Sequence, residues 1–318
     1  MESVEVMFKK LTALVMACAL VFGLTSVAGA APAANSKREI TYKGQVYTVP
    51  VKTDKIVIVG ALEAMEDALV LNFKPLGAPT TGGTFPALFS RITKGVQGIG
   101  EKTQPNLETI LKLKPDVILT STKFPAETNE KLSKIAVTIP VSHISTDWVN
   151  NLKLLGDLIG NKNAATQAVL QYQRELALVK KTLAPKLEDK TVMAIRIRAG
   201  NLFIYPKDVF FNPSLYRDLG ASVPKEVAAA KAQQNISLEK FAEINPDYLF
   251  VQFSPEENAD QPKALEELQK NPIWKSLKAV KNGHVYVNIV DPLAQGGTAY
   301  SKISFLQALK QTKLYKGK

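Results

Sequence analysis

The sequence predicts an α/β protein of two lobes, each with a central parallel-type sheet, joined by one long linker helix. Short apolar strands alternate with helical segments in both halves of the 318-residue chain, which is typical of parallel sheets. One helix–strand unit occurs in each half with the same internal spacing. Between the two copies lies a long stretch with helical periodicity and without Gly or Pro. Together these observations favour a protein of two similar lobes.

The repeated unit covers Asn106–Leu119 and Ser237–Phe250. Each copy begins with a polar residue that can cap a helix, followed by Leu-Glu, and each has Pro-Asp before an apolar strand. Glu108 and Glu239 each precede the proline by seven positions and stand 131 residues apart (239 − 108). Two unrelated helices with an acidic first turn would give a similar pattern. The identical spacing favours a two-lobed protein.

The long helix is predicted over Ala164–Leu183, where apolar residues recur every three or four positions. Twenty helical residues form a rod of about 30 Å, close to one domain diameter. Pro185 is expected to end it. The predicted boundaries are therefore residues 31–160 for the first lobe, 161–184 for the linker helix and 185–318 for the second lobe.

The N-terminal 30 residues predict a secretory signal peptide. Lys9 and Lys10 precede the apolar run Leu11–Val27, and the small residues 28–30 form a cleavage pattern. A transmembrane helix is the alternative, but the run is at the short limit for spanning a bilayer. Cys18 lies in a weak lipidation motif, yet the apolar residues after it favour cleavage after Ala30. The protein is thus predicted to be exported, to the extracytoplasmic face of the cell membrane or the periplasm.

Composition narrows the classes of function. The formal net charge is +11, which favours an anionic partner, and the export signal argues against nucleic acid. A single cysteine excludes an intrachain disulfide, and the only histidines, His143 and His284, lie in opposite halves. His143 follows an apolar strand and is expected to be structural. The sequence contains no GxSxG, GxxxxGK[ST] or HExxH motif, so it gives no signal of a nucleophile elbow, a phosphate loop or a zinc protease site.

The candidate site residues are cationic. Lys102 lies near the end of Pro79–Pro105, just after the glycines of this Gly-, Thr- and Pro-rich segment, which is predicted to be an irregular binding loop. Lys123 follows the first repeated strand. Arg196 and Arg198 alternate on one face of an apolar strand, where ionised groups need partners. From the residues alone, Lys102 and Lys123 are better explained as ordinary surface lysines, whereas a structural pairing of Arg196 with Asp or Glu remains open.

Longer stretches carry a resemblance to a known family. They include Thr122–Pro125, Ile139–Ser145, Pro246–Phe253, Asn271–Val280 and Asp291–Tyr300. With the repeat and the linker helix, they make the chain similar to the class III substrate-binding proteins of ABC importers for iron siderophores and vitamin B12. Within that family, the likeness is to members that bind ferric bacillibactin, and it extends from about Lys55 onward.

The resemblance implies roles for individual residues. Lys102, Lys123 and Arg198 match a basic triad around a ferric tris-catecholate, with Arg196 beside it, and Gln233 matches a polar contact. Glu108 and Glu239 match glutamates that dock on a dimeric membrane permease. Ala199 departs from the glutamine expected there, which puts fine selectivity in question. Residues after Cys18 also depart from the lipoprotein pattern. The resemblance further implies a monomer without a cofactor of its own.

The chemistry of such a ligand agrees with these residues. Three catecholate dianions around Fe(III) leave a charge of −3, and six hard oxygens satisfy the metal, so no protein metal ligand is needed. Cations can balance this charge through charge-assisted hydrogen bonds and cation–π contacts. A ferric hydroxamate or haem carrier of the same fold is the alternative, and a secreted enzyme acting on an anionic polymer or ester is a third possibility.

Overall fold

The computed structural model describes residues 36–317. The predicted signal peptide, Cys18 and the cleavage site after Ala30 lie outside these residues. Among the described residues, no helix combines the length and the apolarity that crossing a membrane requires. The chain begins with an antiparallel hairpin, β1 (Lys37–Tyr42) and β2 (Gln45–Pro50), as its alternating sequence indicates.

The first lobe is built on a six-stranded sheet. Its strand order is β6-β5-β4-β3-β7-β8, and all neighbours are parallel except β5 and β6. The strands are β3 (Ile56–Ile58), β4 (Gly77–Thr80), β5 (Gln97–Glu101), β6 (Gln104–Pro105), β7 (Val117–Ser121) and β8 (Val137–Val141). The helices include α2 (Leu62–Val70), α3 (Ser90–Thr93), α4 (Leu107–Leu113), α5 (Ala126–Ser133) and α6 (Trp148–Leu158).

The second lobe has a five-stranded sheet in the order β11-β10-β9-β12-β13. The parallel prediction holds only for β9, β12 and β13, because β10 returns from β9 through a tight turn and pairs antiparallel with it and with β11. The strands are β9 (Val192–Arg198), β10 (Asn201–Ile204), β11 (Gln234–Asn235), β12 (Tyr248–Phe253) and β13 (Val285–Val287). The helices include α8 (Lys225–Ala229), α9 (Leu238–Ile244), α10 (Ala264–Lys270), α11 (Pro272–Ser276), α12 (Lys278–Lys281), α13 (Ala299–Leu309) and α14 (Lys313–Lys316).

The repeated sequence forms the same structure in both lobes. The side chains of Asn106 and Ser237 accept hydrogen bonds from the backbone N–H groups three residues later and cap α4 and α9. Lys114 and Asn245 end these helices with left-handed backbone, at φ of 48° and 49°. The following strands, β7 and β12, are each paired on both sides by parallel neighbours. The predicted internal similarity is therefore present in the structure.

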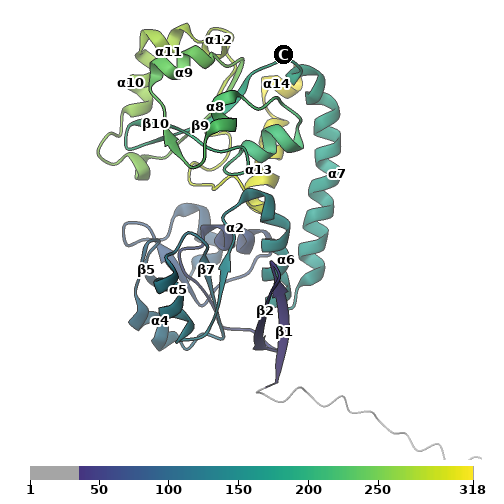
Figure 1. The fold of residues 1–318 in the computed structure, drawn as a ribbon, viewed down its shortest axis with the longest axis vertical. Helices are drawn as coiled ribbons and strands as arrows, with labels where there is room; N and C mark the ends of the chain where they lie inside the picture. Colours follow the sequence, from purple (N-terminus) through teal and green to yellow (C-terminus); the bar gives the residue numbers. More distant parts are fainter. Residues whose placement is uncertain (1–35, 318) are drawn as a thin grey trace, which may run out of the picture. The chain divides into compact units, whose positions relative to one another are not determined.

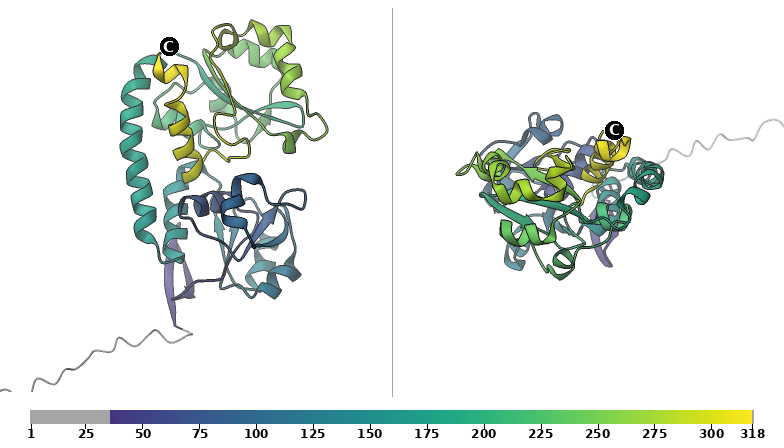
Figure 2. Two further views of the ribbon diagram at one scale, coloured as in Figure 1. Left: turned by 180° about the vertical axis from the view of Figure 1, so that it is seen from behind. Right: turned by 90° about the horizontal axis from the view of Figure 1, so that it is seen from above.

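Helix α7 (Lys162–Leu187) runs alongside both lobes (Figures 1 and 2). The prediction that Pro185 ends it is wrong, because the helix continues to Leu187. A proline removes one backbone hydrogen bond. Leu183 and Leu187 are both buried, and their packing holds the last turn in place.

Two further expectations need correction. Residues Pro79–Pro105 were predicted to be irregular, but they contain α3 and strand β5, whose Ile99 is buried in the core. The glycines of this segment hide the strand pattern because they add no apolar side chain. The sequence predicts a terminal helix over Ser304–Gln311, but α13 begins at Ala299, because Thr298 accepts a hydrogen bond from the Ser301 N–H and caps the helix.

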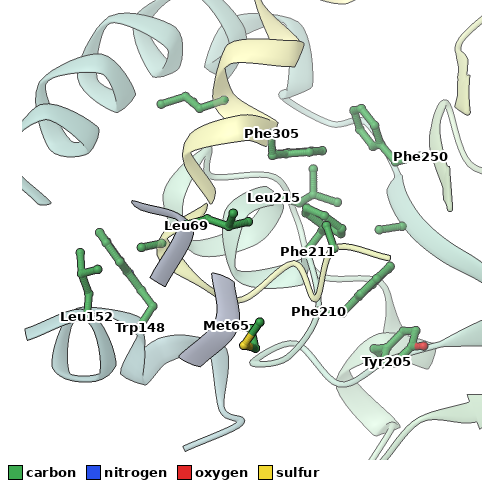
Figure 3. Close-up of a cluster of buried hydrophobic side chains, with 14 of the residues drawn as sticks. Met65, Leu69, Trp148, Leu152, Tyr205, Phe210, Phe211, Leu215, Phe250 and Phe305 are labelled. Carbon is green, nitrogen blue, oxygen red and sulfur yellow. The ribbon is translucent and has the colours of Figure 1, made fainter. Parts of the chain in front are cut away.

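One hydrophobic core reaches from the first lobe into the second. Figure 3 shows side chains of α2 and α6, such as Met65 and Trp148, within the same cluster as Phe211 and Phe305 of the second lobe. Continuous packing of this kind resists separation of the lobes.

Buried polar contacts add to this junction. Glu66 of α2 accepts hydrogen bonds from the Gln295 N–H at 2.7 Å, from the Ser301 hydroxyl at 2.5 Å and from the Thr298 hydroxyl. On the other side, the Ser145 N–H and hydroxyl donate to the carbonyls of Asp208 and Phe210. The lobes are thus joined by α7, by apolar packing and by two sets of polar contacts.

Candidate binding site

A cavity of about 520 Å³ is lined by residues from both lobes. Its volume falls in the range of small-molecule sites. Its wall carries five cationic side chains and two acidic ones. These are Lys102, Lys123, Arg196, Arg198, Lys231, Glu63 and Asp208. The predicted ligand-binding set, including Gln233, therefore meets around a single cavity.

The two lysines come from neighbouring loops of the first lobe. Lys102 follows β5 and Lys123 follows β7, so both lie at the carboxyl edge of the parallel sheet. Gly60, at the end of β3, allows these loops to approach closely. A Cβ at Gly60 would lie 2.5 Å from the Lys102 carbonyl and 2.3 Å from the Phe124 ring, and φ is +65°. Only glycine fits such a position without displacing its neighbours.

The two arginines come from β9 of the second lobe. As predicted from their alternation, they face the same side, and one carboxylate holds both. Glu257 lies 2.6 Å from the Arg196 Nε and 2.6 Å from an Arg198 terminal nitrogen. The Arg196 side chain is 5% exposed, so it is the structurally paired arginine that the sequence left open. Arg198 is 33% exposed and also donates to the side-chain oxygen Oε1 of Gln233 at 3.0 Å.

The three predicted triad members differ in their electrostatic state. Lys102 has no hydrogen bond or ion pair within the described residues, and burial together with nearby Lys123 lowers its pKa to about 8. Lys123 is paired with Glu63 at 2.9 Å. For Arg198, burial acts to lower the pKa, but the pairing with Glu257 raises it overall. The cavity thus gathers several cationic side chains, and the carboxylates of Glu63 and Glu257 neutralise part of their charge.

The rest of the wall offers aromatic and polar groups. Tyr205 and Phe210 stack with ring centroids 4.4 Å apart, and both line the cavity. His143, expected to be structural, also lines it, with Nδ1 2.8 Å from the Thr122 hydroxyl. Burial, followed by the charge of Lys123, lowers the His143 pKa, which favours the neutral imidazole. The wall can therefore contact both the charge and the ring faces of an aromatic anion.

Sequence reasoning missed the two carboxylates that pair with cationic side chains of the site. Glu63 lies in the first turn of α2, and Glu257 follows β12 at the same sheet edge that Lys123 occupies in the first lobe. Superposing the repeats by their 131-residue offset aligns Lys123 with Ser254, close to Glu257. This alignment of the two repeats could have identified Glu257 from the sequence. No comparable signal marks Glu63.

The remaining predicted residues lie outside the cavity. Glu108 and Glu239 are exposed in the first turns of α4 and α9, and Glu108 pairs with Lys112 at 2.6 Å. Figure 1 places α4 and α9 in different lobes, both away from α7. Ala199 has left-handed backbone at φ 45°, and its N–H donates to the Glu257 carbonyl.

The donor set of this cavity suits an anion more than a bare metal ion. Among residues 36–317, no three His, Cys, Asp or Glu side chains gather into a possible metal site. A ligand that carries its own metal and presents negative oxygens would find complementary charges here.

Comparison with known proteins adds family information. Residues 77–288 match the model of the family described as periplasmic binding protein. The iron-uptake system-binding protein of Bacillus subtilis is 54% identical over 275 residues, covering 86% of this chain and 87% of the relative. The iron(3+)-hydroxamate-binding protein FhuD of the same organism is 29% identical over 303 residues, covering 90% and 91%.

Solved structures agree with this grouping. The triscatecholate siderophore binding protein FeuA from B. subtilis, complexed with ferri-bacillibactin, matches with a TM-score of 0.84 and 54% identity over 88% of this chain and 99% of that one. Staphylococcus aureus SirA, complexed with staphyloferrin B, matches with a TM-score of 0.72 and 25% identity over 86% and 97%.

Proposed function

Because the chain belongs to the periplasmic binding protein family, we propose that it is the extracytoplasmic substrate-binding protein of an ABC iron-uptake transporter and carries a ferric tris-catecholate siderophore. The siderophore binds in the cavity between the lobes and is delivered to the permease. Iron is cargo held by the siderophore, and the protein contributes no metal ligand. It acts as a monomer and catalyses no reaction.

One observation carries the choice of ligand. Lys102, Lys123 and Arg198 approach the same cavity from two lobes, beside aromatic rings. A ferric tris-catecholate combines a charge of −3 with aromatic faces, so both features of the wall are used. The 54% identity to a relative whose structure holds ferri-bacillibactin supports the same ligand class.

The test is a fluorescence-quenching titration of the protein without its first 30 residues. A ferric tricatecholate, either bacillibactin or enterobactin, is compared with a ferric hydroxamate such as ferrichrome. We expect tight quenching by the tricatecholate alone, and strong weakening in Lys102→Ala, Lys123→Ala and Arg198→Ala. Selective quenching by the hydroxamate would retain the transport role but reject the basic triad as the source of specificity.

Permease docking is proposed for Glu108 and Glu239. Both carboxylates are exposed at equivalent positions of the repeat, one in each lobe. Each half of a dimeric permease can therefore bind one of them. Glu108→Ala or Glu239→Ala should abolish siderophore uptake by cells and leave the affinity of the purified protein unchanged. Glu243→Ala, also on α9 and exposed, provides a control for charge removal. A loss of affinity in the Glu108 or Glu239 variant would argue against docking.

A further inference from the structure

Glu63 is one of two acidic residues, with Asp208, in a cavity whose other charged side chains are cationic. Its side chain is only 7% exposed, and its Oε1 lies 2.9 Å from the Lys123 Nζ. Glu63 lies in the first turn of α2, at the electropositive N-terminal end of the helix. Lys123 is its one hydrogen-bond partner among residues 36–317.

This pair differs from the carboxylate contact of the two arginines. Glu257 is shared by two arginines, so that group keeps a net positive charge. Glu63 and Lys123 neutralise each other one to one. Both residues line the cavity, and the Lys123 side chain is 44% exposed whereas that of Glu63 is 7% exposed. A ligand can therefore reach the lysine without displacing any main chain.

We propose that Glu63 is a built-in competitor for Lys123, which the anionic ligand has to overcome, and that it thereby limits affinity and allows release to the permease. The inference rests on the proposed function and deepens it. In the empty site, the carboxylate holds the ammonium group in place. When the siderophore binds, Lys123 turns its remaining donors towards the catecholate oxygens while Glu63 repels the trianion.

The direction of the effect follows from Coulomb's law. A carboxylate about 8 Å from a charge of −3 opposes binding even at the dielectric constant of water, by an amount that corresponds to roughly a tenfold loss in affinity. A dry cavity would enlarge the effect and salt would reduce it. A residue that only positioned Lys123 would have the opposite sign, because its removal would loosen a ligand contact.

The test compares Glu63→Gln with wild type by titration with the ferric tricatecholate and by stopped-flow dissociation. Glutamine keeps the size of the side chain and can still accept a hydrogen bond from Lys123. We expect affinity to rise by about tenfold with slower dissociation. Unchanged or weaker binding would overturn the proposal. The thermal midpoint of each variant verifies that it is folded.

A matched control separates the local effect from net charge. Glu266 lies in the first turn of α10 and pairs with Lys270, but it is exposed and outside the cavity. Glu266→Gln removes the same charge and should leave affinity within about twofold, since an exposed charge beyond the Debye length is screened. An equal gain in both variants would assign the effect to the overall charge and refute the role of Glu63.

Failure of the proposed function gives a different result. If wild type binds no ferric tricatecholate, that function is rejected whatever the variants do. The influence of Glu63 on the cavity is then tested at Lys102, because the negative charge of Glu63 raises the Lys102 pKa. An NMR titration of labelled lysine should show a further lowered Lys102 pKa in Glu63→Gln. An unchanged pKa would refute the influence of Glu63 on the cavity.

Discussion

Lys102 should make siderophore binding depend on pH. In the empty cavity its pKa is about 8, because burial and the neighbouring Lys123 disfavour the ammonium form. A bound trianion reverses this and should return the pKa towards about 10.5, the ordinary value. The free site is therefore mostly charged at pH 7 and mostly neutral at pH 9, while the complex is charged at both. Affinity is highest below the free pKa and falls as the pH rises through it.

The magnitude follows from linkage. With a pKa of about 8 in the free site and about 10.5 in the complex, affinity is nearly constant below pH 7 and drops about tenfold between pH 7 and 9. Binding at pH 8 should take up about half a proton. Calorimetry in two buffers of different ionisation enthalpy measures this uptake directly. Titration of the free ligand over the same pH range gives the correction for protonation of the ligand itself.

Two variants determine whether Lys102 is responsible. Lys102→Arg keeps the charge at all these pH values, so both the pH dependence and the proton uptake should disappear. Lys102→Gln should bind weakly at every pH. Flat affinity and zero proton uptake in wild type would refute the argument. Persistence of the full pH dependence in Lys102→Arg would assign it to another group.

Three further predictions concern the junction between the lobes. Lys302 is 1% exposed and pairs with Asp218 at 2.5 Å. Lys302→Met should therefore lower the free energy of unfolding by about 3–5 kcal/mol in denaturant titrations, whereas Lys270→Met, at an exposed position, should change it little. Equal losses in the two variants would contradict the pairing argument. Gly297→Ala would place a Cβ atom 1.7 Å from the Ser145 hydroxyl oxygen. The variant should have a lower thermal midpoint and a lower siderophore affinity than wild type. A variant as stable as wild type would show that the lobe junction can rearrange to accommodate the added methyl group. Small-angle scattering should differ little with and without siderophore, because α7 and the shared core resist hinge bending, and a clear compaction would refute this.

Much of the fold could be predicted because its signals are local in the sequence. The capped repeat and the unbroken periodicity of α7 are encoded within a few turns, so they could be recognised without tertiary information. The mixed second sheet was missed because β10 and β11 are short, and the direction of β10 depends on a tight turn. The last turn of α7 was missed because burial of Leu187 outweighs the local effect of Pro185.

The candidate site was predictable only in part. Lys102, Lys123 and Arg198 were identified through family resemblance, since isolated lysines in loops carry no distinguishing pattern. Glu63 and Glu257 are defined by their partners 60 and 59 to 61 positions away, and such pairing appears only when the chain is folded. The pKa of Lys102 likewise arises from neighbours that the sequence does not place together.

The contacts of Glu66 have a consequence for how a scaffold of this kind could change its cargo. Gln295, Gly297 and Thr298 form part of the cavity wall, and Glu66 holds this loop through a backbone N–H and a hydroxyl at the lobe junction. One segment of the cavity wall is thus held in place from the lobe junction, whereas the charge of the cavity is carried by side chains on the surrounding strands and loops. Exchanging those side chains would retune the protein for a ligand of different charge while the cavity kept its dimensions.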